Sequence, residues 1–512
     1  MTIKTSGLSC KALAASPIND PQRSIRVTPV MSSHAPAAPA AATSAALSST
    51  SSNLAPGPAA AAILRETWAG VHGDPAWLER LDWSGGGSLP SVFPVTELAA
   101  ATAGAASLAV AELIHAASGQ APRAGVDQRL ASLWFGTSLR PQGWEVPPQW
   151  DTVAGDYRAA DGWIRLHTNA PHHRAAALGV LGVPADKAAV AKAVAGWEAS
   201  ALEAAVVGNG GCAAAMRSAA DWATHPQGLA ISQEPLLHWT DFDAGAARQH
   251  AFTRERPLQG IRVLDLTRIL AGPVATRFLA GFGADVLRID PPGWEEPNTV
   301  PEVVLGKRCA RLDLKRGEDL QILEGLLRQA DVMVHGYRAD ALARLGLDAR
   351  RRRELNPGLV DISLDAYGWS GPWQHRRGFD SLVQMSSGIA EAGMRQRGLD
   401  RPGPLPVQAI DHATGYLLAT AAVRGLSRRL ATGAGCQVRA SLARTAQLLL
   451  SNAGLARDTA PLAPESEADM AGQVEATSWG PARRVRPPVT VAGAPVHWAR
   501  PAGALGSAAA AW

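Results

Sequence analysis

Cysteine is scarce in this chain, with four residues among 512, at positions 10, 212, 309 and 436. Their spacing fits neither a disulfide framework nor a zinc site. A chain that uses cysteine in this way is typical of a reducing compartment, so we expect a cytoplasmic protein. No uninterrupted apolar run reaches the length of a membrane span, which predicts no membrane partner.

Charge of either sign is also in short supply, at 18% of residues with a net charge of +4. The densest basic run, Arg350–Arg353, has no aromatic platform or binding motif beside it. We therefore interpret it as the surface of a helix and expect no nucleic-acid partner. Tryptophan is the exception among the aromatics, with 16 residues against seven Phe and four Tyr. The sequence alone gives this excess no function.

Metal binding is not predicted. His167, His172 and His173 lie close in the sequence, but no cysteine or carboxylate cluster joins them in a ligand pattern. We expect these histidines to be solvated or to cap the start of a helix.

Composition divides the chain into four regions. Residues 1–60 are rich in Ala, Ser and Pro and are predicted to be disordered, because they bury too little apolar surface. Residues 61–250 are predicted to form a partial, mostly helical domain, with a helix over Leu98–Ala117 and a strand over Val126–Trp134. Residues 251–455 are predicted to form an α/β domain, and 456–512 an irregular tail rich in Pro, Ala and Gly.

The segment from Pro257 to Asp290 predicts a strand, a helix and a second strand. Ile261–Leu266 and Asp285–Asp290 are apolar runs typical of strands buried on both faces, and Ala271–Phe282 has helical spacing that ends at Gly283. Such a unit builds a parallel sheet. The fold class is therefore α/β, a Rossmann-like parallel sheet with a second helical or mixed domain. No G-x-G-x-x-G follows the first strand, which argues against a nicotinamide oxidoreductase.

An internal repeat relates the two halves of the chain. Pro94–Glu97, an Ala-rich helix and Arg129–Leu133 parallel Pro406–Asp411, a second Ala-rich helix and Val438–Leu442. The first copy places Glu97 near the position of Asp411.

The α/β region resembles the class III CoA-transferases (CaiB/BaiF type), the family of formyl-CoA and carnitine CoA-transferases with α-methylacyl-CoA racemase relatives. The opening 257–290 carries the resemblance, together with four later segments in the same order: 334–346, 365–372, 378–384 and 407–415. The part resembling the family's linking domain, from Asp161 onward, precedes the α/β unit, so the chain is similar to a rearranged or fused member. The resemblance implies acyl-CoA and carboxylic acid substrates, no permanently bound cofactor, and a homodimer. The alternative is that the repeated segment supplies the second half within one chain.

Asp411 is the predicted catalytic residue. Taken alone, an aspartate before an Ala-rich helix is most simply an N-cap. The resemblance implies that it is the nucleophile, which attacks a thioester to form a mixed anhydride. We expect a carboxylate at a helix start to stay ionised, which serves both roles.

The resemblance also implies a set of CoA-binding residues. Arg338 and Arg344 are expected to contact CoA phosphates, with surface salt bridges as the alternative, and Arg268, after the first strand, is expected to face the pocket. Leu270 stands where formyl-CoA transferases carry a glutamine. Phe379 replaces the histidine base of the racemases and cannot move a proton. The predicted binding residues are Arg268, Leu270, Ala271, Arg338, Arg344, Phe379 and Asp380, although Asp380 alone reads as a helix cap. An acyl-CoA racemase and a catalytically silent CoA-binding homologue remain as alternatives.

Overall fold

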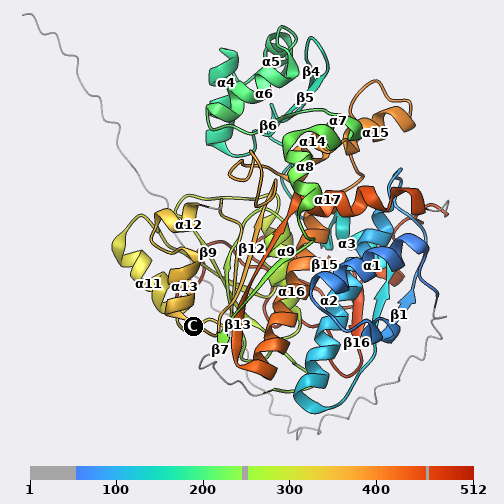
Figure 1. Ribbon diagram of the computed structural model, residues 1–512, viewed down its shortest axis with the longest axis vertical. Coiled ribbons are helices and arrows are strands. Elements are labelled where there is room, and N and C mark those ends of the chain that lie inside the picture. The colour runs from blue at the N-terminus through green and yellow to red at the C-terminus, as the bar shows by residue number, and fades with distance from the viewer. Residues whose placement is uncertain (1–53, 245–251, 339, 457–459) are drawn as a thin grey trace, which may run out of the picture. The chain divides into compact units, whose positions relative to one another are not determined.

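The computed structural model describes residues 54–244, 252–338, 340–456 and 460–512 (Figure 1). Most of the predicted disordered extension, residues 1–53, lies outside the described residues. Helix α1 (Pro58–Gly70) already begins within the predicted 1–60 region.

A seven-stranded sheet forms the centre of the α/β region. Its strands run in the order β10 (Lys307–Arg311), β9 (Asp285–Asp290), β8 (Arg262–Leu266), β11 (Val332–His335), β12 (Val360–Asp365), β13 (Ala434–Ser441) and β7 (His238–Ala244). All neighbours pair in parallel except β7, which is antiparallel to β13. The predicted parallel α/β sheet is confirmed. The edge strand β7 comes from the region that the sequence assigned to a separate first domain.

Helices cover both faces of this sheet. Val263, Val286 and Val332 pack on one face with α9 (Ala271–Gly281) and α16 (Ala409–Thr432). Leu264, Leu287 and Met333, the next residue along each strand, pack on the other face with α11 (Gly317–Leu327). Side chains of a strand alternate between faces, so runs that are apolar at every position specify a sheet buried on both sides. The remaining helices of this region are α10 (Val300–Val303), α12 (Ala341–Arg344), α13 (Ala349–Leu355), α14 (Asp380–Ser386), α15 (Ile389–Gln396) and α17 (Leu442–Ser451).

The strand order reverses between β8 and β11. From β8 the chain proceeds through β9 to β10 on one side, then crosses to β11 and β12 on the other. At such a reversal the loops after neighbouring strands diverge and leave a crevice at the carboxyl ends of the strands. The functional site is therefore expected at the ends of β8 and β11.

The internal repeat is visible as two matching helices, α2 (Val95–Ser118) and α16, which lie side by side in Figure 1 and pack against each other. Both have 24 residues, both are preceded by a residue with φ −75° and ψ 64°, and both end at a left-handed glycine, Gly119 or Gly433. This register places Glu97 and Asp411 at the third position of their helices.

Helix α2 is long and apolar enough to cross a membrane, contrary to the expectation from the sequence. Its apolar window is 89% buried inside the protein, as expected for a core helix. Its small side chains allow the close approach to α16.

The predicted strand Val126–Trp134 is wrong. The structure has β2 (Ala124–Asp127) followed directly by α3 (Gln128–Gly136). The Asp127 carboxylate accepts a hydrogen bond from the Leu130 amide and so begins the helix. An apolar run of nine residues does not by itself distinguish strand from helix, and here the capping residue decides.

The tail is less irregular than expected, because it forms three short strands, two of which pair with strands of the first region. β16 (Val489–Val491) pairs with β2, which also pairs with β1 (Leu81–Ser84). β15 (Gly480–Arg484) pairs with β3 (Leu139–Pro141) and with β14 (Glu475–Thr477).

A small α+β unit occupies residues 155–233. Its strands are β4 (Gly155–Arg158), β5 (Trp163–Leu166) and β6 (Ala213–Ala215), and its helices are α4 (Pro171–Leu181), α5 (Lys187–Val194), α6 (Ala199–Gly208), α7 (Ala219–Thr224) and α8 (Pro226–Gln233). It has its own core around Ile164, Leu202 and Val206.

Gly415 tests the close packing of α16 on α9. A Cβ at this position would lie 2.5 Å from the Ala271 carbonyl oxygen, so the helices would have to separate. Gly415→Ala should lower the free energy of unfolding by about 1–3 kcal/mol in urea titrations. In the matched control Gly325→Ala, in α11, the Cβ meets no atom within 4 Å. There the added methyl should stabilise the protein by about 0.5–1 kcal/mol, and a similar loss at both sites would contradict the packing argument.

Candidate active site

A cavity of about 390 Å³ lies at the carboxyl ends of β8, β11 and β12. Leu266, Gly336 and Leu364, each at or just beyond the end of one of these strands, line it. Asp411 lines the same cavity from the start of α16. The crevice predicted by the strand order is therefore present and contains the predicted nucleophile.

The turn between β8 and α9 forms one wall of this cavity and is strained. Ile269 has φ +65°, a conformation that β-branched residues rarely adopt. Its amide donates a 2.9 Å hydrogen bond to the Glu296 carboxylate. Glu296 also accepts from the Trp294 indole and the Arg288 guanidinium, at 2.8 and 2.9 Å. This buried carboxylate thus holds the strained turn and the Trp294 ring in one arrangement.

Arg268, on the same turn, is held by aromatic rings. Its guanidinium carbon lies 4.5 Å from the centre of a Trp294 ring and 5.3 Å from that of Tyr337. Arg338 lines the cavity from the loop after β11. Neither arginine has a carboxylate partner among the described residues, so both guanidinium groups are available to bind an anion.

The other predicted binding residues divide into two groups. Leu270, Ala271 and Phe379 line the cavity as expected. Arg344 does not line it: it lies on α12 with 69% of its side chain exposed and pairs with Asp340 one turn away.

Asp411 is buried, and the expectation that it stays ionised is wrong for this structure. Its side chain is only 7% exposed. Among the described residues, its carboxylate has no hydrogen-bond donor. Burial, and then the negative charge of Asp380, raise the pKa of Asp411 well above its usual value. Nor is it an N-cap, since Gln408 occupies that position and makes no side-chain cap.

Asp380 supplies the missing cap. Its carboxylate accepts a 2.9 Å hydrogen bond from the Asp411 amide and another from the Gln384 side chain. The predicted cap of the helix that follows Asp380 is therefore wrong: Asp380 is the first residue of α14, which has no side-chain cap, and its carboxylate instead binds an amide in the first turn of α16. Asp380 is fully buried and lines neither cavity, so its predicted contact with CoA gives way to a supporting role. Burial raises its pKa to about 6.

His172 is exposed at the start of α4, as expected, whereas His167 and His173 are buried, contrary to the sequence expectation. His167 stacks on Phe379 with ring centres 3.7 Å apart, and His173 approaches the same ring edge-on at 5.9 Å. Burial lowers the pKa of His167 to about 3 and that of His173 to about 4, so both are neutral. His173 lines the cavity, and both of its ring nitrogens are buried without partners. Within the described part of the chain no cluster of potential ligands is arranged to hold a metal.

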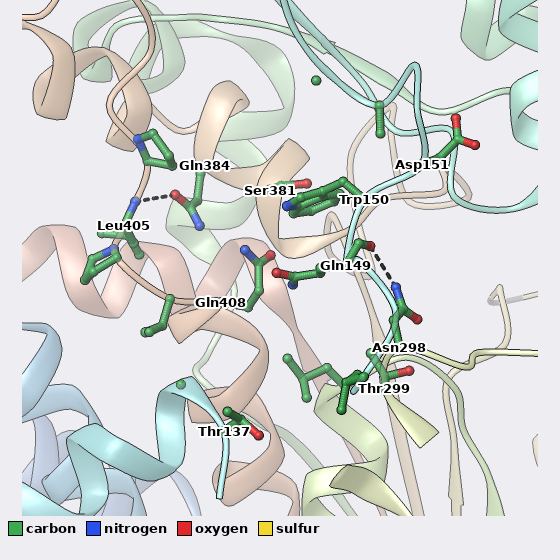
Figure 2. A pocket seen from close by; sticks show the side chains of 18 of the residues that line it. Thr137, Gln149, Trp150, Asp151, Asn298, Thr299, Ser381, Gln384, Leu405 and Gln408 are labelled. Carbon is green, nitrogen blue, oxygen red and sulfur yellow. Dashed lines mark hydrogen bonds between the residues drawn. The ribbon is translucent and has the colours of Figure 1, made fainter. Parts of the chain in front are cut away.

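A second, larger cavity of about 1530 Å³ adjoins the first (Figure 2). We call it the large chamber. Ser381 and His412, the residues directly after Asp380 and Asp411, line it. Leu270 lines both cavities and so lies where they adjoin.

Sequence reasoning missed several residues of the site. Trp294 and Tyr337 enclose Arg268, and Arg377 also lines the smaller cavity. Arg377 directly precedes segment 378–384, which carries part of the family resemblance, so its place in the sequence could have predicted a position at the site. The aromatic enclosure had no sequence signal, because Trp294 and Tyr337 follow different strands.

The coupled carboxyls give a pH-dependent stability. A carboxyl whose pKa is higher in the folded protein binds its proton more tightly there, so this stabilisation is present below about pH 4 and is lost as pH rises through about 6. Asp380→Asn removes one of the two groups and the charge that raises the pKa of the other. The stability of the natural protein relative to this variant should therefore fall between pH 4 and pH 7, as followed by urea unfolding. A difference that stayed constant or grew with pH would contradict the assignment.

Part of the chain is similar to known CoA-transferases. Residues 258–507 match CoA-transferase family III. Mouse succinyl-CoA:glutarate CoA-transferase is 32% identical over 241 residues, 44% of this chain and 52% of the mouse protein. An acyl-CoA transferase of Fusarium pseudograminearum is 34% identical over 236 residues, 41% of this chain and 50% of the fungal protein.

Among solved structures, crystalline Rv3272 of Mycobacterium tuberculosis shares 32% identity over 38% of this chain and 56% of that chain, with a TM-score of 0.36. The chain spans about half the length of the curated relatives it matches. Residues 258–507, which carry the seven-stranded sheet except β7 and contain Asp411, are the part of the chain that is similar to CoA-transferase family III.

Proposed function

We propose that this protein transfers CoA between carboxylic acids through an acyl-aspartyl intermediate on Asp411. The observation that carries the proposal is the position of this carboxylate. It is buried, has no hydrogen-bond partner among the described residues, and faces a cavity that also contains Arg268 and Arg338. An ionised carboxylate without hydrogen-bond donors is a stronger nucleophile than a solvated one.

In the first half-reaction, an ionised Asp411 oxygen attacks the thioester carbon. The C–S bond breaks, and CoA leaves as a thiolate while a mixed anhydride forms. The thiolate then attacks the aspartyl carbon of the anhydride, which releases the first acid as a carboxylate and leaves an aspartyl–CoA thioester.

In the second half-reaction, the acceptor carboxylate attacks this thioester and expels the thiolate, which forms a second anhydride. The thiolate attacks the acceptor's carbonyl carbon, and the new acyl-CoA leaves with Asp411 restored. The amino end of α16 carries partial positive charge, which favours the negative charge that develops beside Asp411.

Asp380 decides which of the two acids carries the proton. It accepts backbone and amide hydrogen bonds, whereas Asp411 accepts none that the structure shows. When the pair holds one proton, that proton is therefore on Asp411. The proposed reaction requires its loss, so we expect the rate to rise with pH through the ionisation of Asp411.

Removing the nucleophile tests the mechanism. Asp411→Ala should reduce CoA transfer on the order of 10³-fold or more, as loss of other nucleophiles does. In the natural protein, hydroxylamine with an acyl-CoA should trap a hydroxamate on Asp411, detected by peptide mass spectrometry. The matched control is Glu97→Ala, at the equivalent position of α2, which lines neither cavity and should retain transfer.

Full transfer by Asp411→Ala would end the proposal. Absence of both transfer and hydroxamate would favour the catalytically silent homologue. If α-deuterium entered acyl-CoA in D₂O and His173→Ala abolished this exchange, the epimerase alternative would be favoured. His173 has the free ring nitrogens that a proton acceptor needs.

The two arginines give a separate test of CoA binding. Arg268→Gln should weaken CoA binding about tenfold, because charge-assisted hydrogen bonds to phosphate are lost. Arg344→Gln, on the exposed face of α12, should leave the affinity unchanged in isothermal titration calorimetry. Equal effects at both positions would place the nucleotide outside the cavity.

The oligomeric state stays a prediction. The resemblance implies a homodimer, and Figure 1 shows the repeated helix α2 already lying along α16 within one chain. Light scattering that gave the mass of one chain would favour the arrangement in which the repeated segment supplies the second half within one chain.

The cytoplasmic location also stays a prediction. Cys212, Cys309 and Cys436 are free and buried, and cell fractionation would test the location.

A further inference from the structure

The large chamber has no role in the chemistry at Asp411 described above. Its volume of about 1530 Å³ exceeds the roughly 300–1,000 Å³ of most small-molecule sites. Much of its wall comes from residues 135–187, which precede the region that matches the family. The structure thus adds to the α/β unit a space that this chain's own first region builds.

Aromatic and amide side chains dominate the wall. Trp144, Trp150 and Trp163 line the chamber, which gives three of the sixteen tryptophans a place in the site. Gln149 and Gln408 extend into it, as Figure 2 shows. Flat aromatic surfaces with neutral hydrogen-bonding groups suit a ring-containing molecule of low charge.

Most charges of the wall are already neutralised or lie in solvent. Asp151 pairs with Arg174 at 2.6 Å, and Glu302 pairs with two arginines. Lys187 and Arg401 line the chamber but are exposed. A second negative charge on a short ligand would therefore find no free cation in the interior.

Arg165, on β5, is also paired with a carboxylate but keeps one unused donor. Its side chain is 12% exposed and lines the chamber. One terminal nitrogen donates to Asp156 at 2.7 Å, and the guanidinium carbon lies 4.5 Å from a Trp150 ring centre. Its Nε–H is buried and has no acceptor among the described residues.

We propose that the large chamber binds a bulky, ring-containing monocarboxylic acid, whose carboxylate accepts from Arg165 and whose rings lie against the tryptophans. The carboxylate takes the free Nε–H of Arg165, which therefore contributes to the affinity for the acid.

Binding without turnover tests this. Calorimetric titration of the full-length protein with naphthoate, an aromatic monocarboxylate, should give at least about tenfold tighter binding than glutarate, a short dicarboxylate. Arg165→Gln should weaken naphthoate binding about tenfold and leave CoA binding unchanged. The matched control Arg328→Gln removes an exposed arginine that pairs with Glu324 on α11 and should change neither. Quenching of tryptophan fluorescence by naphthoate should diminish in Trp150→Leu.

Each outcome decides the proposal. Equal or tighter binding of glutarate overturns the substrate class, and unchanged naphthoate affinity in Arg165→Gln overturns the anchor. If circular dichroism showed that Arg165→Gln does not fold, undiminished naphthoate binding by Trp150→Leu would still overturn the site. Naphthoate binding does not depend on Asp411 chemistry, so hydroxamate trapping can fail while this proposal holds, and the reverse.

Discussion

The site depends on the contact between the Asp380 carboxylate and the first turn of α16. A helix begins with amides that have no partner inside it, and here a carboxylate from another helix satisfies one of them. The same contact puts two acids side by side in a buried place, which raises both pKa values. One interaction therefore fixes where Asp411 lies and how readily it loses its proton. Burial leaves the carboxylate oxygens of Asp411 without competing donors, at the cost of making the ionised state harder to reach.

A second buried carboxylate, Glu296, holds the turn between β8 and α9, which forms another part of the wall of the smaller cavity. It accepts hydrogen bonds from a backbone amide, an indole and a guanidinium. Together these contacts maintain the left-handed Ile269 and the ring beneath Arg268. Strain of this kind persists only where surrounding contacts determine it, and it is concentrated where a ligand must be met in one geometry. The two carboxylates thus hold the nucleophile and the anion-binding arginine from separate elements.

The region that precedes the family match takes part in the α/β unit. The first region is not an independent domain beside the α/β unit. It contributes the edge strand β7, the helix α2 against α16, and much of the wall of the large chamber. The tail then returns to pair with strands β2 and β3. A chain built in this way encloses, between the first region and the α/β region, a space whose chemistry neither region specifies alone.

The sequence by itself determined the elements whose signals are local. The strands 262–266 and 285–290 and the helix between them follow from apolar runs and a terminating glycine, because those preferences act within a few residues. Motif order was enough to single out Asp411, Arg268, Arg338 and Phe379. Only the tertiary structure decided that Asp380 caps another helix and that Arg344 points to solvent. It also showed that two histidines pack against Phe379 and that Arg165 lines the large chamber. Each of these depends on contacts between residues far apart in the chain, and burial and charge at such contacts have no local signature.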